Sequence, residues 1–281
     1  MAPVLCAWTV VAQRGAANVV VTKVFAEGYE KNEHGWYLFP RDAPARRELF
    51  VPEVMDHPAK MSFYLLQEIV KYNTEPGESI LDCFGGSGTT MWAALYGRPV
   101  TLLELEPAFV EMARATVAKW DAEERPHAPI LVLHGDNRQL LPIPTDHMVF
   151  SPPYANDMAK TSGGALNEQV QASVDLYTNS SLNLGRLNEF LYTQAMGKVY
   201  DGVRDSVRGG GTVTITHRDR SRGGRRILFA DTIIKHMTTR GFELKDWFKW
   251  HPPGSIQAAV NRKRGADVIE DEDILMFRRL G

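Results

Sequence analysis

The sequence predicts an α/β protein whose mostly parallel sheet is covered by helices on both faces. Helical and strand-like segments alternate from Pro58 onward, and 44% of the 281 residues are hydrophobic, enough for one large core. Strands that alternate with helices are joined by crossovers, which make neighbouring strands parallel. Ligands of such sheets bind at the carboxyl ends of the strands, where the strand order reverses.

The individual elements follow from hydrophobic periodicity and from the residues that begin and end helices. Apolar residues of 61–72 recur on one helical face, Gly97 ends a second helix, and Pro107 stands in the first turn of a third. We expect helices at 61–72, 89–96, 107–120, 188–207 and 229–239, with the fourth ended by the glycines at 209–211. We expect strands at 80–81, 100–105, 130–133, 148–150, 212–216, 242–250 and 274–277.

The residues before Pro58 predict a separate extension. Two β-like runs within 4–25 indicate a hairpin arm, and residues 27–57, rich in Gly, Pro and charge, indicate an irregular connection. We therefore divide the chain into an N-terminal arm at 1–50 and a main domain at 51–281.

Composition excludes several classes of protein. The formal net charge is −2, so any surface that attracts an anionic partner must be local. Two cysteines, Cys6 and Cys83, exclude a disulfide scaffold and a Cys-rich zinc module, and we expect no metal. No run approaches the roughly 18 apolar residues that a membrane span needs, and the first residues lack the charged region of a signal peptide. We expect a cytoplasmic protein that does not cross a membrane.

The first stretch that carries chemistry is a glycine-rich loop between the strand at 80–81 and the helix at 89–96. It reads Asp-Cys-Phe-Gly-Gly-Ser-Gly-Thr-Thr from Asp82, and Glu104 follows 22 residues later at the end of the next strand. Glycines let backbone approach a ligand closely, and an acid at that place accepts hydrogen bonds from ribose hydroxyls. The glycine spacing differs from a dinucleotide fingerprint, and the loop lacks the lysine of a P-loop. The pattern therefore indicates an adenosine-type site.

The second stretch, Ser-Pro-Pro-Tyr at 151–154, follows the apolar strand at 148–150. Two prolines fix the backbone, so that carbonyl oxygens and the Ser151 hydroxyl are held rigidly beside the flat ring of Tyr154. That arrangement suits a planar base bearing an amino group. It would lie at the same edge of the sheet as Asp82 and Glu104.

Together the two motifs resemble those of DNA amino-methyltransferases, and the second resembles the branch that methylates cytosine N4. The resemblance covers about residues 50–281. It implies a Rossmann-like seven-stranded sheet, S-adenosylmethionine as cofactor, and double-stranded DNA as substrate with the target base flipped out. The catalytic residues it implies are Ser151, Pro152, Pro153 and Tyr154. The cofactor-binding residues it implies are His57, Lys60, Asp82, Phe84, Gly85, Gly86, Gly88, Thr89, Glu104 and Asp136.

Two departures from the family pattern affect these expectations. Cys83 stands where the family usually has proline, which we interpret as a packing change. No long target-reading segment follows the last strand, so we expect target choice to rest on 155–186, 217–226, 251–271 or the N-terminal arm. Within 217–226, Arg218, Arg220, Arg222, Arg225 and Arg226 are candidate contacts to DNA phosphates, although such runs are more often solvated loops.

The two motifs leave some alternative functions open and disfavour others. Methylation of cytosine carbon 5 requires a cysteine nucleophile, and neither cysteine stands in a suitable motif. Methylation of adenine N6 stays open, since that branch differs mainly by Asp or Asn in place of Ser151. An RNA methyltransferase and a non-catalytic binding protein are more distant alternatives, and the glycine spacing disfavours a nicotinamide oxidoreductase.

Overall fold

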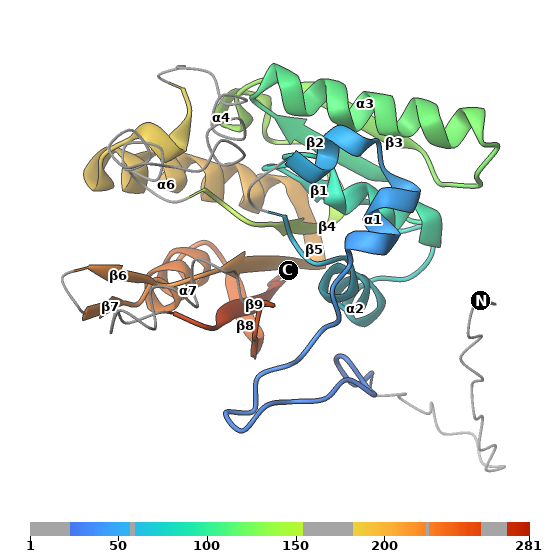
Figure 1. Ribbon diagram of the computed structural model, residues 1–281. Helices are drawn as coiled ribbons and strands as arrows, with labels where there is room; N and C mark the ends of the chain where they lie inside the picture. The colour runs from blue at the N-terminus through green and yellow to red at the C-terminus, as the bar shows by residue number, and fades with distance from the viewer. Residues whose placement is uncertain (1–22, 57–59, 154–181, 223–224, 254–268) are drawn as a thin grey trace, which may run out of the picture.

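The computed structural model describes residues 23–56, 60–153, 182–222, 225–253 and 269–281, and shows a seven-stranded sheet with helices on both faces (Figure 1). The strand order is β3-β2-β1-β4-β5-β9-β8. The predicted fold class is therefore confirmed. The predicted hairpin arm lies outside the described residues up to position 22, and its last residue, Phe25, lies in a turn rather than a strand.

Five neighbouring strands are parallel and the last two complete the sheet in antiparallel pairings. The strand order reverses between β1 and β4, so this gap is the topological switch point at which such sheets bind ligands. The strands are β1 (Ile80–Asp82), β2 (Val100–Glu104), β3 (Ile130–His134), β4 (Thr145–Phe150), β5 (Val207–His217), β8 (Phe242–Trp250) and β9 (Glu272–Arg279).

The main helices begin and end close to the predicted positions. Asn188 caps α6 by accepting a hydrogen bond from the Leu191 backbone, and Gly97 ends η2 in the left-handed region with φ of 77°. The segment at 89–96 is a 3₁₀ helix. The helical segments are α1 (Ala43–Leu49), η1 (Pro52–Asp56), α2 (Phe63–Asn73), η2 (Thr89–Tyr96), α3 (Pro107–Ala122), α4 (Asn137–Leu140), η4 (Leu184–Arg186), α6 (Glu189–Ser206) and α7 (Ala230–Thr238).

Side chains alternate along the strands and so divide the hydrophobic core between the two faces. On the first face, α2, η2 and α3 pack against Ile80, Leu102 and Val149. On the second, α6 and α7 pack against Leu81, Leu103 and Phe150, among others. Both faces are covered, which explains why the short strands read as continuous apolar runs.

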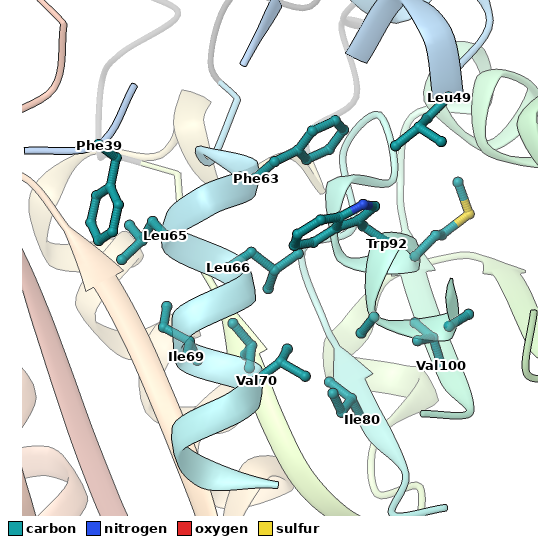
Figure 2. Close-up of a cluster of buried hydrophobic side chains, with 14 of the residues drawn as sticks. Phe39, Leu49, Phe63, Leu65, Leu66, Ile69, Val70, Ile80, Trp92 and Val100 are labelled. Carbon is teal, nitrogen blue, oxygen red and sulfur yellow. The ribbon is translucent and has the colours of Figure 1, made fainter. Parts of the chain in front are cut away.

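The core of the first face is centred on α2 (Figure 2). Phe63 stacks on Trp92 of η2, with ring centroids 5.5 Å apart and an interplanar angle of 12°. Leu66 is fully buried beside them. This packing fixes η2, and with it the glycine loop that precedes η2, against the rest of the molecule.

α6 ends within one residue of the predicted position, but the predicted role of glycines 209–211 in ending it is wrong. The helix ends at Ser206, and the glycines lie inside β5. A Cβ on Gly211 would lie 2.1 Å from the Asp146 carbonyl oxygen, so only glycine allows β5 to approach β4 there. The register between these strands shifts at the same place. The glycines therefore serve a close strand contact and a bulge.

The connection at 27–57 contains more regular structure than predicted, namely α1 and η1. It lies against the edge strand β8. Tyr37 donates its backbone N–H to the Lys249 carbonyl, and its own carbonyl accepts from the His251 backbone, both at 2.9 Å. Phe25 stacks on Phe248 with ring centroids 4.5 Å apart. This segment protects the edge of the sheet.

Candidate functional site

The glycine loop leaves the carboxyl end of β1 and is held in shape by Asp82. This carboxylate is 4% exposed and accepts hydrogen bonds from the Thr90 hydroxyl at 2.5 Å and the Phe84 backbone at 2.9 Å. Burial raises the pKa of Asp82 to about 6, against the opposing effect of these hydrogen bonds. Asp82 therefore joins the two ends of the loop.

The glycines of the loop adopt conformations that other residues avoid. Gly86 and Gly88 have φ of 50° and 86°. A Cβ on Gly88 would lie 2.6 Å from the Met91 methyl carbon, while one on Gly85 would press on Leu102 and the Leu103 carbonyl at 3.2 and 3.3 Å. The loop thus lies flat against β2, with the Gly85 N–H donating to Leu103 at 2.9 Å. Phe84 packs beside Phe150 of β4.

Glu104 ends β2 beside this loop. One carboxylate oxygen accepts from the Gly86 backbone at 2.6 Å and the other from the Glu106 backbone at 2.7 Å. Burial raises the pKa of Glu104 to about 7; the two hydrogen bonds oppose the shift and the charge of Glu106 adds to it. A carboxylate held by two backbone donors retains free lone pairs, so Glu104 can also accept hydrogen bonds from two hydroxyl groups.

Asp136, at the carboxyl end of β3, is occupied by its neighbours. It caps α4 by accepting from the Arg138 backbone, and its two oxygens also accept from the Arg138 guanidinium at 2.6 to 3.1 Å. Burial alone would raise its pKa, but the hydrogen bonds and charge of Arg138 outweigh burial and lower it. Arg138 further donates to the Leu182 carbonyl at 2.9 Å. The structure therefore presents an Asp136–Arg138 unit beside the loop.

The second motif begins where β4 ends. β4 pairs with β1 in parallel, with Leu81 level with Met148, so Ser151 follows the strand that neighbours the glycine loop across the switch point. Ser151 is exposed, Pro152 is buried and Pro153 is half-buried, while Tyr154 lies outside the described residues. The two motifs are thus brought to the same edge of two adjacent strands, as predicted.

Arg46 is a site neighbour that the sequence did not reveal. It lies on α1, is 1% exposed, and donates to the Thr89 hydroxyl at 2.9 Å, to Asp42 at 2.8 Å and to the Met61 carbonyl at 2.9 Å. Its guanidinium lies 4.0 Å from the centroid of the Phe63 ring. Thr89 is one of the predicted cofactor residues, so Arg46 ties the segment before α2 to the loop. The Pro44 that opens α1 was the available sequence signal for this helix.

Cys83 stands in the glycine loop, and Lys60 and His57 are the remaining predicted cofactor residues. The Cys83 thiol is buried, which together with the charge of Asp82 raises its pKa well above the usual value, so it is no nucleophile. The Cys83 carbonyl accepts from Asn137 of α4 at 2.8 Å. Lys60 donates to the Met55 carbonyl at 2.9 Å. His57 lies outside the described residues.

The arginine-rich segment forms a two-stranded antiparallel ribbon, β6 (Arg220–Arg222) and β7 (Arg225–Ile227). Arg226 pairs with two buried carboxylates, Asp219 at 2.7 Å and Asp271 at 2.6 Å. Arg218, which precedes the ribbon, lies 3.6 Å from Glu272. Arg218 and Arg226, the two candidate arginines whose side chains the structure describes, therefore both have carboxylate partners within the molecule.

In the part of the chain that the structure describes, no group of three or more His, Cys, Asp or Glu side chains is arranged to hold a metal ion. Among the same residues, no helix is both long and apolar enough to cross a membrane.

Comparisons with known proteins bear on this site. Residues 16–115 match the N6_N4_Mtase family model, described as DNA methylase. A stretch of 72 residues is 39% identical to the type II methyltransferase M.BglI of Bacillus subtilis, covering 24% of this chain and 21% of that enzyme. The chain thus spans about a fifth of the length of that curated relative.

Two solved structures match most of this chain at low identity. TrmN from Thermus thermophilus matches with a TM-score of 0.49 and 15% identity, over 79% of this chain and 50% of that one. A SAM-dependent methyltransferase from Methanosarcina mazei matches with a TM-score of 0.49 and 10% identity, over 75% and 97% of the two chains.

The family match includes the glycine loop and Glu104 and ends before Asp136 and Ser151. It supports S-adenosylmethionine as the cofactor. The residues present fit that cofactor, since Glu104 offers a carboxylate for two ribose hydroxyls beside a loop whose glycines leave its backbone uncovered.

Proposed function

We propose that this chain is a site-specific DNA methyltransferase that methylates the exocyclic N4 amine of cytosine, with S-adenosylmethionine as methyl donor. The observation that carries the proposal is the placement of Ser151, Pro152 and Pro153 at the end of β4, next to the glycine loop at the end of β1. The match to the DNA methylase family model supports the cofactor half of this assignment. Ser151, Pro152 and Pro153 lie outside that match, and their placement supports the assignment of the methyl acceptor.

S-adenosylmethionine supplies, when bound, a methyl group activated by a sulfonium. Glu104 would hold its ribose, and the flat loop at Gly85 and Gly86 would lie against it. The Asp136–Arg138 unit would lie beside its adenine ring. These residues orient the donor, and orientation is the main contribution a protein makes to a direct displacement.

On the acceptor side, the amine of a base is a poor nucleophile because its lone pair is conjugated with the ring. Hydrogen bonds from the amino protons to the Ser151 hydroxyl and the Pro152 carbonyl draw the nitrogen toward tetrahedral geometry. Tyr154 would stack on the base, which has to leave the duplex to enter the site. Serine is too weak a base to take the proton beforehand, so proton loss accompanies or follows methyl transfer.

We further propose that the arginine ribbon contacts the DNA backbone. In the backbone register of the ribbon, Arg222 pairs with Arg225 and Arg220 pairs with Ile227. Arg226 already forms ion pairs with Asp219 and Asp271. The density of arginine in this short ribbon supports Arg220, Arg222 and Arg225 as the phosphate contacts.

Mass spectrometry of nucleosides from DNA incubated with the protein and isotope-labelled S-adenosylmethionine tests the proposal. We expect labelled N4-methylcytosine. N6-methyladenine as the sole product would change the base but keep the enzyme class, whereas label in RNA and none in DNA would refute DNA as substrate.

Tyr154→Ala tests the acceptor site within the same assay. Loss of base stacking should cost on the order of 1 to 3 kcal/mol of base binding and lower the rate, while affinity for S-adenosylmethionine stays unchanged. Tyr154→Phe is the matched control, because it keeps the ring and should retain most activity. Equal activity of the alanine variant and the parent would contradict the stacking role.

A further inference from the structure

The catalytic motif is contacted by a residue from a distant part of the chain. Tyr192, on the second turn of α6, donates its hydroxyl to the Pro153 carbonyl at 2.7 Å across 39 residues of sequence. Its ring is partly buried and packs against the hydrophobic cluster formed by α6, α7 and the strands of the second face. A side chain held in this way presents its hydroxyl from a fixed position.

A hydrogen bond to the Pro153 carbonyl can fix the backbone orientation of the Ser-Pro-Pro segment. The rings of Pro152 and Pro153 fix both φ angles, and a residue that precedes proline is restricted to extended ψ angles. Ser151 and Pro152 both precede proline. The ψ angle of Pro153 is therefore the main backbone freedom left in the motif, and it determines where the carbonyl points and where the chain continues.

We propose that Tyr192 is a positioning residue for the methyl-acceptor site, which it orients by holding the Pro153 carbonyl. This inference rests on the proposed function, since it assigns Ser151, Pro152 and Pro153 to the acceptor. Tyr192 acts through the backbone of the motif and takes no part in cofactor binding.

The chain provides a matched control at Tyr37. That residue also donates its hydroxyl to a backbone carbonyl, the one of Phe25, at 3.1 Å in a buried setting. It lies in the segment that pairs with β8, away from the end of β4. Tyr37→Phe and Tyr192→Phe therefore remove the same kind of hydrogen bond and leave both rings in place.

The test measures steady-state methyl transfer to duplex DNA with labelled S-adenosylmethionine for the parent and both variants. We expect Tyr192→Phe to lower kcat roughly tenfold, the effect of one hydrogen bond on the geometry of the reacting groups. The dissociation constant for S-adenosylmethionine, measured by calorimetry, should stay within twofold of the parent. Tyr37→Phe should retain the parental kcat.

Thermal unfolding of the two variants separates positioning from general stability. Similar small decreases in Tm, with kcat lowered only in Tyr192→Phe, would support the inference. A parental kcat in Tyr192→Phe, or an equal loss of kcat in both variants, would overturn it. If the parent protein methylates no DNA, the proposed function fails instead, so the two failures are distinguishable.

Discussion

Cofactor affinity should depend on pH through Glu104. In the proposed complex ribose hydroxyls would donate to this side chain, so binding would favour its ionised form. Burial raises the pKa of Glu104 to about 7 in the free protein, because removal of water disfavours the charged carboxylate. At pH values below about 7 most molecules must therefore lose a proton from Glu104 before the cofactor binds well.

The magnitude follows from the ionised fraction. With a pKa of about 7, roughly a quarter of Glu104 is ionised at pH 6.5 and nearly all at pH 8.5, so affinity should rise about fourfold across this interval. Asp136 is not expected to contribute, because Arg138 keeps its pKa low. Asp82, with a pKa of about 6, titrates mainly below the interval.

Isothermal titration calorimetry of S-adenosylmethionine at pH 6.5, 7.5 and 8.5 measures the effect. Glu104→Gln is the control, since an amide does not titrate and its affinity should be weaker and constant. A flat profile in the parent would refute the reasoning, as would a fourfold rise that persists in Glu104→Gln. The second result would assign the titration to another group.

Three further predictions concern the loop, the core and the ribbon. Gly86→Leu places a side chain at a φ of 50° beside Glu104 and should abolish measurable cofactor binding in calorimetry. Leu66→Ala leaves a cavity beside Trp92 and should lower the free energy of unfolding in urea by about 2 to 5 kcal/mol. Arg222→Ala with Arg225→Ala should reduce the slope of log DNA affinity against log salt by roughly 2, whereas Arg226→Ala should reduce it by much less than 1. Parental cofactor affinity in Gly86→Leu would contradict the first prediction, and a parental unfolding free energy in Leu66→Ala the second. A parental salt slope in the double arginine variant would contradict the third.

The sequence predicted those elements that local signals determine. Gly97 and Asn188 mark a helix end and a helix start in both sequence and structure, because capping involves residues close in the chain. The two motifs were predicted to lie at one sheet edge because strands that alternate with helices pair in parallel, and the carboxyl ends of parallel strands meet at the same edge. The topology then brought β1 and β4 together as expected.

Features that depend on distant residues were not predictable. Gly211 was assigned to a helix end because its reason, the Asp146 carbonyl of the neighbouring strand, lies 65 residues away. Arg226 was predicted to contact DNA phosphates because its partner in the fold, Asp271, lies 45 residues further along the chain. The role of Arg46 likewise depends on Thr89. In each case the role of the residue depends on a partner that is distant in sequence and comes close only in the folded chain.

The two halves of the candidate site are held together in different ways. On the cofactor side, hydrogen bonds cross between strand ends: the Gly86 backbone to Glu104, the Gly135 backbone to the Glu104 carbonyl, and Asn137 to the Cys83 carbonyl. On the acceptor side, Pro152 and Pro153 have no backbone N–H, so these two residues cannot be held by backbone donors of their own. Their carbonyls can still accept hydrogen bonds, and Tyr192 donates to that of Pro153. A rigid donor half and an acceptor half oriented from α6 can thus be altered separately, which is why cofactor affinity and kcat are expected to respond to different substitutions.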